Sequence, residues 1–200
     1  GQHYASELMY NDLVDQAELF QEAIKYYANI LTPFSPLVER KIEEVLKLEL
    51  PVKLICPSHG IIWRENPGQI IEKYLEWSRA YQEDQITILY DTMWESTRKM
   101  AEAIGKGISE VRPNTAVKLY NVSLSDMNDV ITEVFKSKAV LLGSPTVNKG
   151  ILSAMAGVLE LIRGMAFKGK KGGTFGSYGW SGESPKLLHE KLEAAGFEMI

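Results

Sequence analysis

The sequence is poor in cysteine, has no long apolar run and carries no excess of positive charge. Cys56 is the only cysteine among 200 residues, so neither an intrachain disulfide nor a thiolate cluster can form. A single thiol suits a reducing cytosol, and we expect a cytoplasmic protein. No stretch has the length of a membrane span, and the start lacks the pattern of a signal peptide. The net charge of -4 argues against nucleic acids and membranes as partners, because both attract basic surfaces.

The overall composition is that of an ordinary globular protein, with 45% hydrophobic and 24% charged residues. A chain of this length corresponds to one or two domains. It begins with Gly1-Gln2-His3-Tyr4, without an initiator methionine, and its last residues, 197–200, resemble the opening of a strand. We therefore expect the chain to be an interior piece of a longer protein.

The first 80 or so residues are predicted to be mainly helical. Apolar residues recur at three- and four-residue steps over positions 13–31, which is typical of an amphipathic helix, and Thr32-Pro33 is expected to end it. A second helix is predicted after Ser35, which would act as its N-cap, and a third after Asn66-Pro67. Between them, residues 51–57 are predicted to form a short buried strand closed by proline.

A polar break at residues 82–85 is interpreted as a domain boundary, with one domain over residues 1–82 and another over residues 86–200. After the break, strands and helices alternate regularly. The predicted strands are 86–90, 116–120, 139–142 and 171–177, and the predicted helices are 97–111, 126–135, 153–163 and 184–195. This alternation predicts an α/β fold, a doubly wound parallel sheet with helices on both faces.

In such sheets, ligands bind beyond the carboxyl ends of the strands. The loop at residues 91–97 follows the first strand and opens directly into a helix. Free N–H groups at the helix start and the hydroxyls of Thr92, Ser96 and Thr97 can surround a phosphate. The loop has neither the lysine of a nucleoside-triphosphate loop nor a G-x-G-x-x-G motif, so it favours a monophosphate. The alternative is that Ser96 and Thr97 only cap the helix.

Two further loops reach the same edge. Residues 143–150 are small and turn-prone, so their backbone can approach a flat ligand closely; the alternative is an ordinary turn. Residues 176–183 place Tyr178 and Trp180 among glycines. Trp180 is interpreted as stacking on a planar ring, with core packing as the alternative. A phosphorylated planar ring system satisfies all three loops, and FMN is the cofactor that matches.

These loops also resemble those of a known family. The stretches Thr92-Met93-Trp94-Glu95-Ser96-Thr97, Gly143-Ser144-Pro145-Thr146 and Gly176-Ser177-Tyr178-Gly179-Trp180-Ser181-Gly182 resemble the flavodoxin module of flavodiiron proteins, also called rubredoxin:oxygen oxidoreductases. Three earlier stretches, Gly1-Gln2-His3-Tyr4, Tyr26-Tyr27-Ala28-Asn29-Ile30-Leu31 and Pro57-Ser58-His59-Gly60-Ile61-Ile62-Trp63-Arg64, resemble the last part of that family's metallo-β-lactamase-like domain. The resemblance covers the whole chain.

For the fold, the resemblance implies a flavodoxin-like sheet of order 2-1-3-4-5, truncated at strand five and preceded by the end of an αββα metallo-β-lactamase-like domain. For the flavin, it implies contacts from Thr92, Met93, Trp94, Glu95, Ser96, Thr97, Ser144, Pro145, Thr146, Val147, Asn148, Ser177, Tyr178, Gly179, Trp180, Ser181 and Gly182. Glu95 departs from the family, because flavodoxins usually place a small neutral residue there and a carboxylate repels phosphate unless it points to solvent.

For the metal, the resemblance implies a diiron site in which His59 is the last ligand and the other ligands lie upstream, partly in an H-x-E-x-D-H motif. Neutral imidazole is a suitable ligand for iron. His3 and His189 match no ligand position; the first is expected to be structural and the second a surface helix residue. Cys56 is expected to be a small buried residue.

The implied activity is reduction of dioxygen to water, or of nitric oxide to nitrous oxide, at the diiron centre. FMN would receive electrons from rubredoxin or a similar carrier, and a head-to-tail homodimer would bring the FMN of one subunit beside the irons of the other. The alternative is a flavodoxin-type electron carrier in which the helical segment serves as packing. An upstream H-x-E-x-D-H motif would discriminate in favour of the enzyme.

Overall fold

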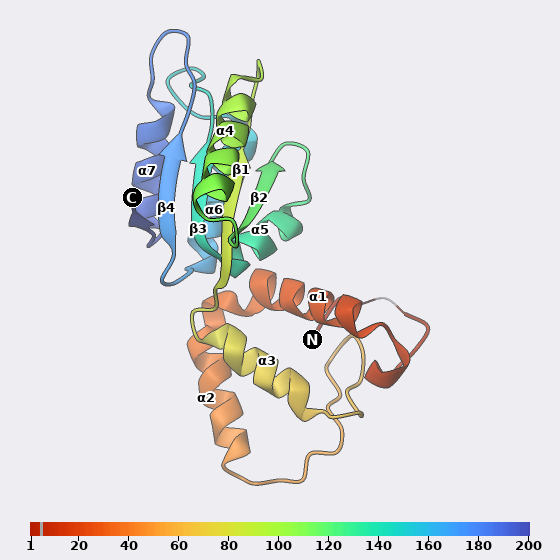
Figure 1. The fold of residues 1–200 in the computed structure, drawn as a ribbon. Coiled ribbons are helices and arrows are strands. Elements are labelled where there is room, and N and C mark those ends of the chain that lie inside the picture. The colour runs from red at the N-terminus through yellow and green to blue at the C-terminus, as the bar shows by residue number, and fades with distance from the viewer. Residues whose placement is uncertain (5) are drawn as a thin grey trace. The chain divides into compact units, whose positions relative to one another are not determined.

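The computed structural model describes residues 1–4 and 6–200, and these form two compact units (Figure 1). The first, Gly1–Tyr81, is called the helical unit, and the second, Gln82–Ile200, is called the sheet unit. Each is described by itself. Among the described residues, no helix combines the length and apolar character needed to cross a membrane.

The sheet unit contains a five-stranded parallel sheet of order β2-β1-β3-β4-β5, which confirms the predicted doubly wound fold. The strands are β1 (Glu83–Tyr90), β2 (Ala116–Asn121), β3 (Ser137–Gly143), β4 (Lys171–Phe175) and β5 (Glu198–Met199). The helices are α4 (Ser96–Val111), α5 (Met127–Lys136), α6 (Ser153–Met165) and α7 (Ser184–Ala194). Strand and helix alternate as the sequence predicts.

Helices cover both faces of this sheet, with α4 on one face and α6 on the other (Figure 1). Neighbouring residues of a strand point to opposite faces, and Ile88 and Leu89 of β1 are both fully buried. Ile88 packs with Ala101 of α4 and Phe175 of β4 in one core cluster. Burial on both faces explains why β3 is a continuous apolar run rather than an alternating one.

The first strand begins at Glu83, three residues before the predicted start, so the polar break is wrong as a description of residues 83–85. Gln85 is buried, and its amide donates to the Glu133 carboxylate at 2.7 Å and to the Ser137 hydroxyl at 3.1 Å. The hydroxyls of Thr87 and Ser137 share a further hydrogen bond of 2.7 Å. Polar residues extend the strand here because their partners lie inside the same unit.

The helical unit begins with a short 3-10 turn (Asn11–Leu13) and α1 (Gln16–Tyr26), which Asp15 caps through the Glu18 N–H. The helix continues as a π-helical turn (Tyr27–Leu31), which is followed by a 3-10 turn (Thr32–Phe34) and then by α2 (Ser35–Leu46). The predicted end of the first helix at Thr32-Pro33 is confirmed, because the π-helical turn ends at Leu31 and the proline lies in the first turn of the next segment, where its missing N–H is tolerated.

Two other predictions for this unit are wrong. Ser35 is not an N-cap but the first residue of α2, and its hydroxyl lies 2.9 Å from the Tyr27 hydroxyl. Residues 51–57 are not a buried strand; in the described chain only Ile55 forms a bridge there, to Trp63, and Val52 and Leu54 are exposed. The third helix, α3 (Gly68–Ser78), forms after Asn66-Pro67 as predicted.

Candidate functional site

Three loops of the sheet unit start side by side at the carboxyl edge of the sheet. Tyr90, Gly143 and Phe175, the last residues of β1, β3 and β4, are aligned across the sheet. The loops are joined by backbone hydrogen bonds, including Asp91 N–H to Gly143 O at 2.9 Å and Thr146 N–H to Ser177 O at 2.8 Å. The structure therefore brings together the three loops that the sequence places at one edge.

Two cavities lie among these loops and share Thr146 and Gly179. The first, of about 410 Å³, is lined by Met93, Trp94, Ser96, Pro145, Thr146, Val147, Ser177, Tyr178 and Gly179. The second, of about 450 Å³, is lined by Thr146, Asn148, Lys149, Gly179, Trp180 and Ser181. Each is large enough for part of a cofactor, and most of the predicted flavin contacts line one or the other.

The aromatic residues of this edge are exposed. Trp180 is 98% exposed, Trp94 85% and Tyr178 67%. The core-packing alternative for Trp180 is therefore wrong. Three exposed aromatic rings around two cavities offer flat apolar faces to a planar ligand.

The start of α4 lies beside the first cavity, and no side chain caps it. Glu95, the residue before the helix, has a left-handed backbone with a φ of 65°. Thr97 directs its hydroxyl to Ser177, at 2.9 Å, rather than to its own helix. The alternative that Ser96 and Thr97 serve as caps is therefore wrong, and the first-turn N–H groups are left at the positive end of the helix dipole.

A family comparison accounts for this combination of sheet, loops and uncapped helix. The family model described as flavodoxin matches residues 88–200. The chain belongs to the flavodoxin family. A flavodoxin binds FMN at the switch point of its sheet, between the first and third strands, which is the edge described above.

Relatives of this flavodoxin-family chain include larger proteins. It is 55% identical to the anaerobic nitric oxide reductase flavorubredoxin of Vibrio vulnificus over 99% of its own length and 40% of that protein. The Klebsiella pneumoniae protein of the same name is 54% identical over 100% of this chain and 41% of its own. The chain thus spans about two fifths of the length of the curated relatives it matches.

Two solved structures match over nearly the whole chain. Rubredoxin oxygen:oxidoreductase from Desulfovibrio gigas has a TM-score of 0.95 and 36% identity, covering 100% of this chain and 50% of that one. The flavodiiron protein from Giardia intestinalis has a TM-score of 0.91 and 31% identity, covering 99% and 48%. Both the helical unit and the sheet unit thus have counterparts in these structures.

Unpaired polar atoms in the flavodoxin loops fit the binding of FMN. Among the described residues, two buried side-chain oxygens lack a hydrogen-bond partner, Thr92 Oγ1 and Glu183 Oε2. They belong to the loops after β1 and β4. A buried polar atom without a partner needs an explanation. The Thr92 hydroxyl can donate to a phosphate oxygen, and the Glu183 carboxylate can accept from a hydroxyl or a ring N–H, groups that FMN carries.

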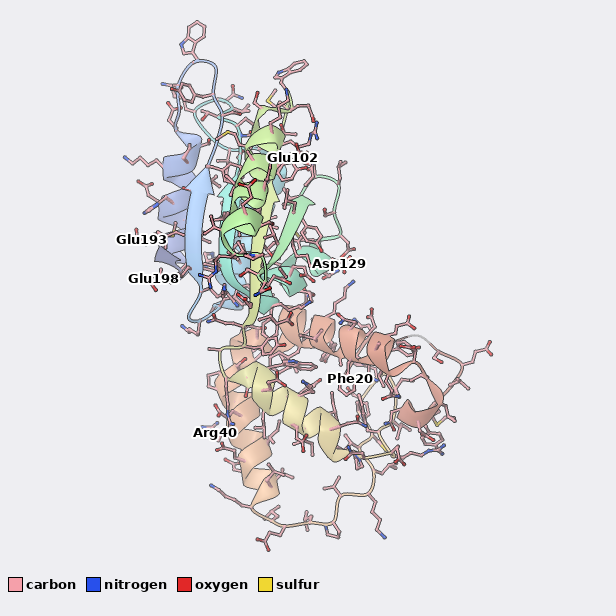
Figure 2. The ribbon with its side chains drawn as sticks, viewed as in Figure 1. Phe20, Arg40, Glu102, Asp129, Glu193 and Glu198 are labelled. Carbon is pink, nitrogen blue, oxygen red and sulfur yellow. The ribbon has the colours of Figure 1, made fainter. Side chains whose placement is uncertain are left out.

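The Glu95 carboxylate is compensated by a cation. The Arg98 guanidinium donates to Glu95 and, at 2.6 Å, to Glu102, which lies on α4 (Figure 2). The hydrogen bond to Glu95 is the main cause that raises the pKa of Arg98 above its ordinary value. The carboxylate that departs from the family pattern is thus held in an ion pair and partly neutralised, which lowers its repulsion of a phosphate.

Two predicted contacts lie behind the cavity walls. Ser144 is fully buried; its hydroxyl donates to Pro145 O at 3.0 Å and accepts from the Leu152 N–H at 3.1 Å. Thr97 is also fully buried and bonded to Ser177. As the structure stands, both residues position the loops rather than face the cavities, because their hydroxyls are already engaged inside the unit.

Gly182 also acts on a neighbour. A Cβ at this position would lie 3.2 Å from the Tyr178 ring, so the glycine lets that ring pack closely.

Lys149 is a residue that the sequence prediction left out, although it lines the second cavity. Its place in the turn at residues 147–150 was the available signal, but a lysine in a loop is usually a solvated charge.

His59, in the helical unit, is exposed, and its Nδ1 lies 3.4 Å from Gln2 O. The rings of His3 and Tyr26 each lie 5.2 Å from its ring. Among the described residues, no three His, Cys, Asp or Glu side chains form a group that could hold a metal ion. His59 as an iron ligand thus stays a prediction. Cys56 is exposed, so its expected burial is wrong, because the segment around it is not a buried strand.

Proposed function

We propose that the protein carrying this chain is an FMN- and diiron-dependent reductase of nitric oxide to nitrous oxide, of dioxygen to water, or of both. FMN would receive electrons from rubredoxin or a similar carrier. The observation that carries the proposal is the reach of the identity to nitric oxide reductase flavorubredoxins, which includes the helical unit as well as the sheet unit. A simple electron carrier needs only a flavodoxin domain. That alternative does not explain why the identity extends over the helical unit as well.

In this proposal the sheet unit binds and orients the flavin. The uncapped start of α4 and the Thr92 hydroxyl hold the phosphate, and Trp94, Tyr178 and Trp180 enclose the ring. When bound, FMN supplies the transfer of electrons between the carrier and the metal centre. The chain's own contribution is to fix the ring at the carboxyl edge and to leave part of the aromatic rim open to a partner.

The helical unit would be the C-terminal part of a metallo-β-lactamase-like diiron domain, over residues 1–82, with His59 as one iron ligand. Its exposed imidazole, next to two other rings, is available to a metal. A head-to-tail homodimer would place the flavin of one subunit beside the irons of the other. A cytoplasmic location, consistent with the single cysteine, belongs to the same proposal.

The test uses the full-length protein. We expect stoichiometric FMN and about two iron atoms per chain, and anaerobic consumption of nitric oxide when an electron carrier is supplied. His59→Ala should lower iron content and activity while FMN remains bound, and His189→Ala, a matched histidine on α7, should change neither. A full-length protein that holds FMN but no iron would instead favour the electron carrier. Rates with nitric oxide and dioxygen, measured with the same donor, would rank the two substrates.

A further inference from the structure

The turn between β3 and α6 presents a lysine in an unusual backbone conformation. Val147 and Gly150 exchange two backbone hydrogen bonds, of 3.1 and 2.8 Å, and enclose Asn148 and Lys149. The φ values of these two residues are 51° and 60°. Two successive positive φ values are the arrangement of a type I′ turn, whose second central position strongly favours glycine. A lysine is therefore strained there, and strain of this kind is often kept for function.

Lys149 belongs to the lining of the second cavity. The side chain is exposed and lines the cavity together with Trp180 and Ser181. No carboxylate pairs with it among the described residues, whereas Arg98, in the first turn of α4, is bonded to Glu95 and Glu102. Trp180 thus lines a cavity that also has an uncompensated positive charge among its lining residues.

We infer that Lys149 sets the reduction potential of the bound flavin by stabilising the negative charge that the ring acquires on reduction. The inference rests on the proposed binding of FMN at this edge. Oxidised FMN takes up two electrons from the carrier and one proton from solvent, so the ring gains one negative charge. A cation at the cavity rim attracts the reduced ring and leaves the neutral oxidised ring almost unaffected, whereas the aromatic side chains contact both forms.

The decisive measurement is a potentiometric titration of the FMN-loaded full chain. It is carried out without oxygen, with dithionite as reductant and a reference dye. In Lys149→Gln, the preference for reduced over oxidised FMN should fall about tenfold, as expected for one charge at a water-exposed rim. A tenfold change corresponds to a midpoint potential lower by about 30 mV for a two-electron couple. Lys149→Arg should retain the potential of the unsubstituted chain.

Two control variants separate the effect of the Lys149 charge on the potential from the effect of its backbone conformation and from that of the net charge of the chain. Lys149→Gly removes the charge but suits the turn, so it should reproduce the shift of Lys149→Gln even if the glutamine variant folds poorly. Lys168→Gln removes an exposed lysine after α6 and should leave the potential unchanged.

An unshifted potential in both Lys149→Gln and Lys149→Gly would overturn the inference while leaving FMN binding intact. An equal shift in Lys149→Arg would also overturn it, because the effect would then not depend on the charge. An unsubstituted chain that takes up no FMN would contradict the proposed function itself, and with it this inference.

Discussion

The two units of the chain differ in the burial of their apolar side chains. In the sheet unit, β1 and β3 bury residues on both faces, such as Ile88, Leu89, Val140 and Leu142. In the helical unit, many of the large apolar residues within the segment 34–54 stay exposed, and these are Phe34, Leu37, Val45, Leu46, Leu48, Leu50, Val52 and Leu54. A sheet between two helix layers buries apolar surface on two sides, and no strand ladder does this among the described residues of the helical unit.

The candidate sites differ in the same way. The flavin site draws all its residues from three loops of one unit, and their bonds to each other hold them at the sheet edge. In the helical unit, His59 has two ring neighbours but no group of metal ligands among the described residues. All residues of the candidate flavin site thus come from one unit, and the predictions below test how far this difference between the units holds.

The largest expected effect compares one leucine from each unit. Leu142 is fully buried in β3, so Leu142→Ala should lower the free energy of unfolding of the sheet unit by about 2–5 kcal/mol. Leu48 is 62% exposed, so Leu48→Ala should cost less than about 0.5 kcal/mol. Amide hydrogen exchange measures each unit separately. Equal losses would mean that the contrast in burial does not describe the protein in solution.

The second prediction concerns the loop after β4. A Cβ on Gly176 would lie 2.4 Å from Ser144 O and 2.5 Å from Ser184 Oγ, so Gly176→Ala should destabilise the sheet unit by about 1–3 kcal/mol. Gly179, in the same loop, has nothing within 4 Å of such a Cβ, and Gly179→Ala should leave stability unchanged. Thermal unfolding of both variants checks the pair, and a stable Gly176→Ala would show that the loops are not locked together.

The third prediction contrasts two tryptophans. Trp180 is exposed at the cavity, so Trp180→Ala should weaken FMN binding about tenfold, typical of lost ring stacking, without loss of stability. Trp63 is buried in the helical unit, so Trp63→Ala should destabilise that unit and leave FMN affinity unchanged. Flavin fluorescence titration gives the affinities. Unchanged affinity and potential in Trp180→Ala would show that this ring does not stack on the flavin.

The smallest expected effect concerns a buried charge. Lys170 Nζ donates to Phe135 O and Ser137 O, at 2.7 and 2.6 Å, and burial lowers the pKa of Lys170 to about 7. Between pH 7 and the ordinary lysine pKa of about 10.5, the unfolded chain binds more protons than the folded one, so stability rises with pH. Below pH 7 the lysine is charged in both states and its contribution is constant.

Denaturant unfolding should therefore show the sheet unit about 1 kcal/mol more stable at pH 8 than at pH 7. Lys170→Met should remove this slope. Arg79→Gln, which breaks exposed ion pairs of the helical unit with Glu39 and Glu43, should leave the slope unchanged. A slope that persists in Lys170→Met would assign the pH dependence to another group.

Much of the sheet unit could be predicted from periodicity, because a parallel sheet needs apolar strands and helices with one apolar side. The first three residues of β1, 83–85, were missed because apolar periodicity does not detect a buried Gln85, whose partners come from α5 and β3. The helix types of the helical unit were also difficult to predict from apolar spacing. A helix that changes from α to π to 3-10 at Tyr27 and Thr32 keeps its apolar spacing only approximately.

By itself, the sequence determined the order of strands and helices in the sheet unit and the three loops that meet at its carboxyl edge. The tertiary structure decided which members of those loops face a cavity. Thr97 turns inward to Ser177 of another loop, and Ser144 turns inward to Pro145 and Leu152 of its own connection. Glu95 is partly neutralised by Arg98, and among the described residues no carboxylate pairs with Lys149 at the rim. Local patterns report which residues are apolar or turn-forming, but the direction of a polar side chain depends on partners that only folding brings near.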